Sequence, residues 1–273
     1  MVQSRNLPLE IDVMAGGTSF PRTIINSLLH MGLVPKRLRA SYLIHERTGG
    51  TVAAGPFFGM RYIEESVGSA LYPKLLGTYE MELHAIIEKL CTQKYEYIID
   101  VGAAEGYYAV GMAIRCPRAK IVAYESEQRG RSLLQKLAEL NGDEEKIEIH
   151  GTCDLDILHQ QLEKIGTSKT LIVMDVEGYE IDLLDPERVP GLKRCSMLVE
   201  IHDGRELGPI GKALEDRFKS SHRIESVWSR PRYRDDLPGK GSYIVDLRMQ
   251  KMMDEGRLRG LSWFYLEVSP EAI

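Results

Sequence analysis

The sequence predicts a doubly wound α/β domain, and its alternating pattern carries that prediction. From residue 97 onward, short β-branched runs alternate with amphipathic segments of helix length. The runs are too short for buried helices, whereas a buried parallel strand is a continuous apolar run of this kind. Helix-ending signals follow two of the longer segments, at Asn141-Gly142 and Gly166. The alternation indicates βαβ units and a mostly parallel sheet with helices on both faces.

The elements follow in chain order. The runs predicted as strands are 97–99, 120–124, 147–149, 171–174 and 197–201. The segments predicted as helices are 79–90, 107–115, 129–140, 155–165 and 179–184. In the first of these, apolar residues recur at helical spacing at Leu83, Ile86, Ile87 and Leu90. That helix therefore has one apolar face, which we expect to pack on the following domain.

The first 80 residues differ in character from the rest of the chain. They contain an apolar helical stretch at 24–33, a basic patch at 36–39 and a Gly-rich segment at 49–59. We predict two parts. Residues 1–80 form a mainly helical N-terminal cap or an oligomerisation segment, such as a homodimer contact, and residues 81–273 form the ligand-binding domain.

Composition and charge exclude several classes of protein. The 273 residues are 43% hydrophobic and 27% charged, which is ordinary for a globular chain. The net charge of −5 disfavours a nucleic-acid partner. The sequence has no apolar run of about 18 residues, and its four cysteines form no C-x-x-C pair. From the polar residues in its first 12 positions we expect no signal peptide. We expect a cytoplasmic protein with reduced thiols and no membrane partner.

The functional residues are expected where the predicted strands end, because ligands bind outside the carboxyl ends of the strands in such sheets. The first strand continues into Asp100–Gly106, of sequence D-V-G-A-A-E-G. Gly102 and Gly106 permit a tight turn and the close approach of a ligand, and the amides that open the next helix can receive a carboxylate. A glycine turn at this junction also has a purely steric explanation.

Acids follow the second and third predicted strands. Glu125 comes directly after the second apolar run, where nucleoside-binding sheets place an acid that accepts both ribose hydroxyls. Glu127 is a nearby alternative, and a solvated loop charge is the structural explanation. Asp154 is placed either to accept from an adenine amino group or to cap the helix that begins at Leu155.

Ionisable side chains gather after the fourth and fifth predicted strands. The segments are D-V-E-G-Y-E at 175–180 and E-I-H-D at 200–203. Such groups are costly to desolvate beside an apolar sheet, so chemistry explains them better than stability does. An Arg-rich segment at 229–241 has the composition of a mobile loop over the site, whose charge would attract an anionic substrate group. Acids interrupt the run, and we interpret it as a solvated surface loop.

Together, the glycine turn, Glu125 and the D-V-E-G-Y-E and E-I-H segments resemble class I S-adenosylmethionine-dependent methyltransferases, and within them the FkbM-like group. The motifs cover residues 79–203. The resemblance implies a Rossmann-like methyltransferase fold, with a seven-stranded sheet whose last strand is antiparallel. Residues 223–228 and 264–268 would be the sixth and seventh strands, and 81–273 the S-adenosylmethionine-binding methyltransferase domain.

The resemblance also implies which positions meet the cofactor. They are Asp100, Gly102, Ala103, Glu105, Gly106, Tyr124, Glu125, Asp154 and Asp175. Two positions depart from the family pattern. Ala104 stands where the family usually has Asn or Gly, and Glu105 stands where it has an apolar residue. We expect Glu105 to meet the ammonium group of the cofactor.

The implied reaction is in-line transfer of the sulfonium methyl group, in this family most often to a hydroxyl of a sugar or another small molecule. Aligning the reactants supplies much of the catalysis, and a base that removes the hydroxyl proton adds about 10²–10⁴-fold. His202 and Asp175 are the catalytic candidates, because histidine titrates near neutrality and Asp175 is placed to orient the substrate or contact the ammonium group. A hydrogen-bonded structural histidine and a turn-capping aspartate are the alternatives.

Three further alternatives stay open. Asp175, Glu200 and Asp203 offer oxygen ligands for Mg²⁺, although we do not favour a metal. An NAD(P)-dependent oxidoreductase would also use a glycine turn and an acid, but the third glycine of G-x-G-x-x-G is absent. A non-catalytic nucleoside-binding protein would have lost the turn or its acids, whereas both glycines and Glu125 are present.

Overall fold

The computed structural model describes residues 44, 48–167, 169–203, 206–239, 250–256 and 262–269. The chain divides into two compact units, 1–49 and 50–273, and nearly all described residues belong to the second. The predicted helical stretch at 24–33 and the basic patch at 36–39 lie outside the described residues. The predicted boundary at residue 80 lies within the second unit, and a cap or dimer role for residues 1–80 stays a prediction.

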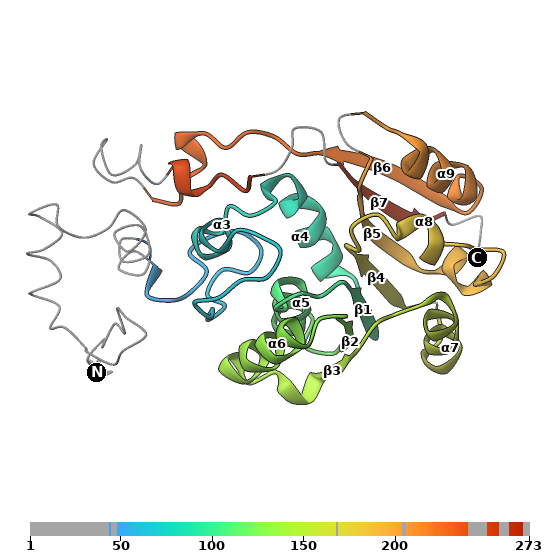
Figure 1. Cartoon of the computed structure of the whole chain (residues 1–273), viewed down its shortest axis with the longest axis horizontal. Helices are drawn as coiled ribbons and strands as arrows, with labels where there is room; N and C mark the ends of the chain where they lie inside the picture. The colour runs from blue at the N-terminus through green and yellow to red at the C-terminus, as the bar shows by residue number, and fades with distance from the viewer. Residues whose placement is uncertain are drawn as a thin grey trace, which may run out of the picture. The chain divides into compact units, whose positions relative to one another are not determined.

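The second unit is built on a seven-stranded sheet of order β3-β2-β1-β4-β5-β7-β6 (Figure 1). The strands are β1 (Tyr97–Val101), β2 (Lys120–Tyr124), β3 (Ile147–His150), β4 (Thr170–Met174), β5 (Ser196–Ile201), β6 (His222–Trp228) and β7 (Ser262–Val268). The first five pair in parallel, and β7 lies antiparallel between β5 and β6. The sheet is therefore mixed. Its doubly wound arrangement and its antiparallel last strand confirm the predicted seven-stranded fold.

Helices cover both faces of the sheet (Figure 1). They are α3 (Leu71–Leu76), α4 (His84–Thr92), α5 (Tyr107–Arg115), α6 (Gln128–Asn141), α7 (Leu155–Ile165), α8 (Glu180–Leu183) and α9 (Pro209–Phe218). Figure 1 shows α5 and α6 on one face and α7, α8 and α9 on the other. Among the described residues, no helix has the length and apolarity that crossing a bilayer requires.

The helix ends follow local chemistry. Helix α6 ends at Gly142, whose φ of 74° places it in the left-handed region that glycine adopts readily. The predicted helix at 79–90 begins later than expected, because Met81–Leu83 form a 3₁₀ turn before α4 starts at His84. The segment 179–184 supplies only the single turn of α8.

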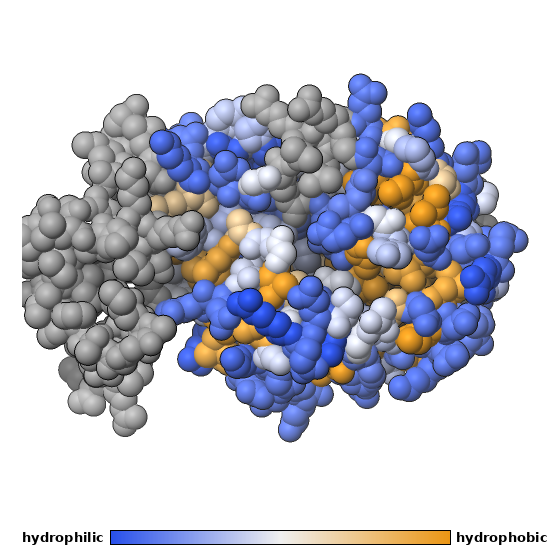
Figure 2. Space-filling view, in the orientation of Figure 1, coloured by the Kyte–Doolittle hydropathy of each residue, from blue (hydrophilic) through white to orange (hydrophobic). Residues whose placement is uncertain are grey.

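The core lies on both sides of the central strands. On one side, Leu158 and Leu162 of α7 and Phe218 of α9 pack with alternate residues of the strands, such as Ile172 and Val199. Each such side chain contributes about 1.5–3 kcal/mol when it leaves water. The visible surface of the described residues is largely hydrophilic, with apolar patches between the polar side chains (Figure 2).

The segment 50–80 packs on α5 and α6. Phe57 lies edge-on to Tyr107, with ring centroids 5.1 Å apart. The backbone amide of Arg61 donates to Asn141 Oδ1 at 2.9 Å, and the Arg61 guanidinium donates to the Leu140 carbonyl. These contacts hold residues 50–80 against α5 and α6, and residues 67–69 of this segment line the cavity at the carboxyl ends of the strands.

The interpretation of 229–241 as a solvated loop is wrong for Arg232. Its side chain is only 5% exposed and forms ion pairs with Glu82 and Glu255, which are equally buried. Its Nε also donates to the Thr78 carbonyl at 3.1 Å. Two carboxylates from distant parts of the chain bind this guanidinium, which the local composition of the segment does not reveal.

Candidate active site

A cavity of about 1110 Å³ opens at the carboxyl ends of β1, β2, β4 and β5. Its walls come from the segments that follow these strands and β3, together with residues 67–69, Lys74, Tyr79, Glu255 and Gly256. Most of the predicted site residues line it: Asp100, Gly102, Ala103, Tyr124, Glu125, Asp154, Asp175 and His202. Glu105 and Gly106 are not among its lining residues. The site lies at the edge of the sheet that the sequence predicts.

The glycine turn after β1 is held against β2 and β4. Gly102 has a φ of 86°, and a Cβ placed there would lie 1.7 Å from the carbonyl oxygen of Asp175. The amides of Gly102 and Ala103 both donate to the Tyr124 carbonyl. Only glycine fits this position, because both its backbone conformation and its neighbour exclude a side chain.

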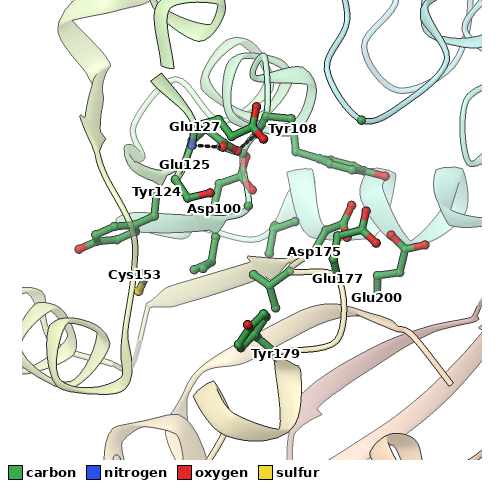
Figure 3. A pocket seen from close by; sticks show the side chains of 18 of the residues that line it. Asp100, Tyr108, Tyr124, Glu125, Glu127, Cys153, Asp175, Glu177, Tyr179 and Glu200 are labelled. Atoms are coloured by element: carbon green, nitrogen blue, oxygen red, sulfur yellow. Dashed lines mark hydrogen bonds between the residues drawn. The ribbon is translucent and has the colours of Figure 1, made fainter. Parts of the chain in front are cut away.

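Glu125 is buried at the wall of the cavity, only 8% exposed. Its Oε2 accepts from the Ala104 amide at 2.8 Å, and its Oε1 accepts from the Glu127 amide at 2.7 Å (Figure 3). A carboxylate has about four acceptor sites, so these two amides orient the group and leave it capacity for a ligand hydroxyl. Glu127 also lines the cavity, but it has no comparable anchoring of its carboxylate among the described residues.

Asp100 is a buried acid with acceptor capacity to spare. It lies in the wall of the cavity, is 3% exposed, and its Oδ2 has no hydrogen-bond partner among the described residues. Burial, aided by the nearby carboxylates of Asp175 and Glu125, raises the pKa of Asp100 to about 7. A donor or cation brought by a ligand would satisfy this oxygen.

Glu105 does not face the cavity, and the expectation that it meets a ligand ammonium group is wrong. Its carboxylate is fully buried and ion-paired with Lys74. It also accepts from Tyr62 Oη at 2.8 Å, Ser66 Oγ at 2.6 Å and the Val67 amide at 3.0 Å. Burial alone would raise the pKa of Glu105, but Lys74 and these donors outweigh it and lower the pKa.

Gly106 and Asp154 both have structural roles. Gly106 precedes α5 with a φ of 98°, and a Cβ there would lie 2.8 Å from Leu134 Cγ. Its position outside the cavity lining fits the steric explanation of the turn. Asp154 caps α7 by accepting from the Ile157 amide at 2.8 Å, and it also lines the cavity. Contact of Asp154 with an adenine stays a prediction.

His202 is surrounded by carboxylates at the ends of β4 and β5. Its Nδ1 donates to Glu180 Oε1 at 2.6 Å, while its Nε2 lies 3.4 Å from Glu177 Oε2 and 3.6 Å from Asp175 Oδ1. Burial lowers the pKa of His202, but its hydrogen bond to Glu180 and the three carboxylate charges outweigh burial and raise the pKa. A raised pKa favours the imidazolium form, which donates a proton rather than accepting one.

The carboxylates of Asp175, Glu177 and Glu200 lie beside one another and apart from Glu125 and Glu127 (Figure 3). Ligand atoms of Asp175, Glu200 and His202 all lie within 4.8 Å of one another. Of the three residues considered as oxygen ligands for Mg²⁺, Asp203 does not join Asp175 and Glu200 in this group. Asp203 lies before α9, and its carboxylate accepts from the amides of residues 208, 210 and 211 at the start of that helix, at 2.6–3.0 Å.

Strained backbone also occurs around the cavity. The described residues other than glycine with positive φ are Glu80, Ala104 and Glu177, at 46°, 48° and 53°. Ala104 and Glu177 line the cavity, and Glu80 accepts from Tyr108, which lines it too. Left-handed backbone costs a non-glycine residue about 1–3 kcal/mol and is concentrated at functional sites. Its position here agrees with a binding role for the cavity.

Several lining residues were not predicted. Lys74, Tyr79, Tyr108 and Glu255 reach the cavity from α3, the segment before α4, the start of α5 and the segment before β7. No motif marks Lys74 or Glu255. Once Glu105 is known to be fully buried, its carboxylate requires a cation nearby. The sequence alone does not say which lysine or arginine supplies that cation.

Comparisons with known proteins give distant structural likenesses. No family model matches the chain. No curated protein matches it either. Precorrin-6y C5,15-methyltransferase from Geobacter metallireducens is 11% identical over 77% of this chain and 94% of its own, with a TM-score of 0.47. An S-adenosylmethionine-dependent O-methyltransferase from Thermotoga maritima is 15% identical over 70% and 66%, with a TM-score of 0.44.

A third likeness is to a structure that contains S-adenosylmethionine. Fibrillarin from Aeropyrum pernix, with that molecule natively bound, is 16% identical over 64% of this chain and 67% of its own, with a TM-score of 0.40. TM-scores below 0.5 and identities of 11–16% leave the function of this chain to be argued from its own site.

Proposed function

We propose that this protein is an S-adenosylmethionine-dependent methyltransferase that acts on a hydroxyl of a sugar or another small molecule. The observation that supports this most is the joining, in one cavity, of the Gly102 turn, the anchored Glu125 carboxylate and the buried Asp100. The cavity lies at the carboxyl ends of the parallel strands, where doubly wound sheets bind nucleoside ligands.

The described residues suit the parts of this cofactor. Glu125 presents acceptor oxygens for a ribose diol, and Tyr124 and the segment 152–155 form the neighbouring wall for an adenine. Asp100, with an oxygen that lacks a hydrogen-bond partner among the described residues, suits the methionine ammonium group. When bound, the cofactor supplies a methyl group that is already activated by a sulfonium.

The acceptor would occupy the side of the cavity formed by Asp175, Glu177, Glu200 and His202. Carboxylates accept hydrogen bonds from hydroxyl groups and repel anions, so this wall favours a neutral polyol over a phosphorylated or carboxylated acceptor. Asp175 and His202 both lie on this wall, so the hydroxyl proton would be released beside them.

The test is ligand-induced thermal stabilisation, followed by calorimetry. S-adenosylmethionine and S-adenosylhomocysteine should raise the melting temperature, because a ligand at 100 times its Kd stabilises the folded state by about 2.7 kcal/mol. NAD and NADP should leave the melting temperature unchanged. Stabilisation by a nicotinamide cofactor and by neither sulfur compound would overturn the proposal in favour of an oxidoreductase.

The finer parts of the proposal need other measurements. Mass spectrometry of extracts incubated with methyl-labelled cofactor should find the label on oxygen of a small molecule or carbohydrate. Label on nitrogen or on a macromolecule would contradict the proposed acceptor and the FkbM-like grouping. We also propose that the protein acts in the cytoplasm. Residues 1–80 would serve as a cap or a homodimer contact, and solution scattering of the full chain would test that role.

A further inference from the structure

We propose that Asp175, Glu200 and His202 form a binding site for a divalent cation at the carboxyl ends of β4 and β5. Each residue offers one ligand atom, and all three atoms lie within 4.8 Å of one another. All three residues line the cavity, on the side assigned above to the acceptor. The existence of the site stands apart from methyl transfer, whereas the role given to it below rests on the proposed function.

The strand order brings these three residues together. Strands β4 and β5 are parallel neighbours, with Met174 beside Val199 in the register. Asp175, the residue after Met174, therefore lies beside Glu200, the residue after Val199. His202 directly follows the end of β5. Glu200 and His202 are two residues apart in extended chain, so they point to the same side. A backbone arrangement of this kind positions ligands on rigid elements instead of a mobile loop.

Glu180 orients the imidazole for ligation through the other nitrogen. Its carboxylate is fully buried, and its Oε1 accepts from His202 Nδ1 at 2.6 Å and from the Gly178 amide at 3.1 Å. Nε2 is then the nitrogen on the side of Asp175, at 3.6 Å from its Oδ1. Histidines that bind metals through one nitrogen usually donate the other N–H to a carboxylate or carbonyl in this way.

The donor set defines the class of cation. Two carboxylate oxygens and one imidazole nitrogen suit a first-row divalent ion such as Mn²⁺, whereas Ca²⁺ and Mg²⁺ prefer oxygen ligands alone. Three protein ligands leave further coordination positions open on such an ion. Two neighbouring oxygens of a diol acceptor could occupy them, which would orient the acceptor and make its hydroxyl more acidic.

The experiment is a titration of Mn²⁺ into the full chain, without S-adenosylmethionine, with unbound ion measured by electron paramagnetic resonance. One ion should bind per chain, and pulsed measurements should show coupling to a ligated nitrogen. Asp175→Asn, Glu200→Gln and His202→Asn should each weaken binding by more than about tenfold. His202→Asn should also abolish the nitrogen coupling.

The matched control is Asp154→Asn, which removes one negative charge from the same cavity while asparagine can still cap α7. This variant should bind Mn²⁺ as the wild type does. If Asp154→Asn weakened Mn²⁺ binding as much as the ligand variants do, general charge attraction would explain the effect and the site would be overturned. The absence of Mn²⁺ binding to the wild type, or binding that survives all three ligand variants, would also overturn it.

Two further measurements keep the outcome clear. Circular dichroism reports whether Glu200→Gln folds, because Glu200 is only 3% exposed. If it does not, Asp175→Asn and His202→Asn decide, since their side chains are 33% and 16% exposed. Calorimetry with S-adenosylhomocysteine in buffer containing a chelator tests the proposed function separately. Cofactor binding without Mn²⁺ binding would remove the cation site alone.

Discussion

At the scale of single residues, Glu125 should control cofactor affinity. Its oxygens are anchored by the Ala104 and Glu127 amides and border the cavity. Hydrogen bonds to a charged acceptor contribute about 1.5–3 kcal/mol each, so Glu125→Ala should weaken S-adenosylhomocysteine binding about ten- to hundredfold or more in calorimetry. Glu127→Ala, on the same loop, is the control and should change affinity little. Equal losses in both variants would assign the ribose contact to neither residue.

Asp100 predicts a pH dependence of stability in the ligand-free protein. Its folded-state pKa of about 7 lies above the ordinary value of 3.8, so the folded state keeps a proton that the unfolded state loses between these values. Its contribution to stability therefore falls as pH rises from about 4 to 7. Asn cannot titrate, so the unfolding free energy of Asp100→Asn should rise relative to that of the wild type between about pH 4 and pH 7, by at most about 1.4 kcal/mol per pH unit.

Urea unfolding of both proteins at pH 5 and pH 8 measures this gap. The difference in unfolding free energy, Asp100→Asn minus wild type, should be larger at pH 8. A gap of equal size at the two pH values would contradict the protonated Asp100. Asparagine retains an acceptor for the Ala109 amide that contacts Asp100, so the substitution preserves the local hydrogen bond.

At the scale of the element, Asp154 stabilises the start of α7. Its carboxylate accepts from the Ile157 amide, which would otherwise lack a partner in the first turn. Asp154→Ala should lower the free energy of unfolding by about 0.5–2 kcal/mol, whereas Asp154→Asn should retain most of it. Thermal unfolding of the two variants without ligand checks this. Equal destabilisation by both would show that the charge, and not the cap, matters.

The elements were largely predictable because their signals are local. All five apolar runs became strands, and 107–115 and 155–165 became α5 and α7 with the predicted ends. The start of α4 could not be predicted, because Glu80 takes a φ of 46° and a 3₁₀ turn precedes the helix. Glu80 is fully buried and bound to Tyr108 of α5, so a contact between distant residues sets this conformation. No window of sequence around position 80 contains that information.

The candidate site divides in the same way. Gly102, Glu125 and Asp175 could be predicted because each directly follows a strand, and strand ends meet at one edge of a parallel sheet. Glu105 lies in the same turn, but its carboxylate is buried against Lys74 of α3 and is not among the residues that line the cavity. Lys74 and Glu255 were missed because they reach the site from segments with no periodic or motif signal of their own.

At the scale of the whole molecule, the Lys74–Glu105 ion pair joins α3, in the segment 50–80, to the turn between β1 and α5. Both side chains are almost fully buried, at 3% and 0% exposure. Glu105→Leu or Lys74→Met alone should cost about 3–5 kcal/mol, because each leaves an unpaired buried charge. The double variant should be more stable than the sum of the two losses implies. Urea unfolding of the wild type, the two single variants and the double variant completes a double-mutant cycle. Strictly additive losses of unfolding free energy would contradict the Lys74–Glu105 ion pair.

The place of β7 in the sheet has a consequence for how the chain matures during synthesis. Strand β6 is made first, yet it reaches the sheet only through β7, which lies between it and β5. Until residues 262–268 leave the ribosome, β5 keeps an open edge of unpaired backbone groups, and β6 has no partner in the sheet. Open edges of this kind invite pairing between chains. A nascent chain stopped before residue 262 is therefore prone to aggregate, even though every residue of the proposed cation site has already been made.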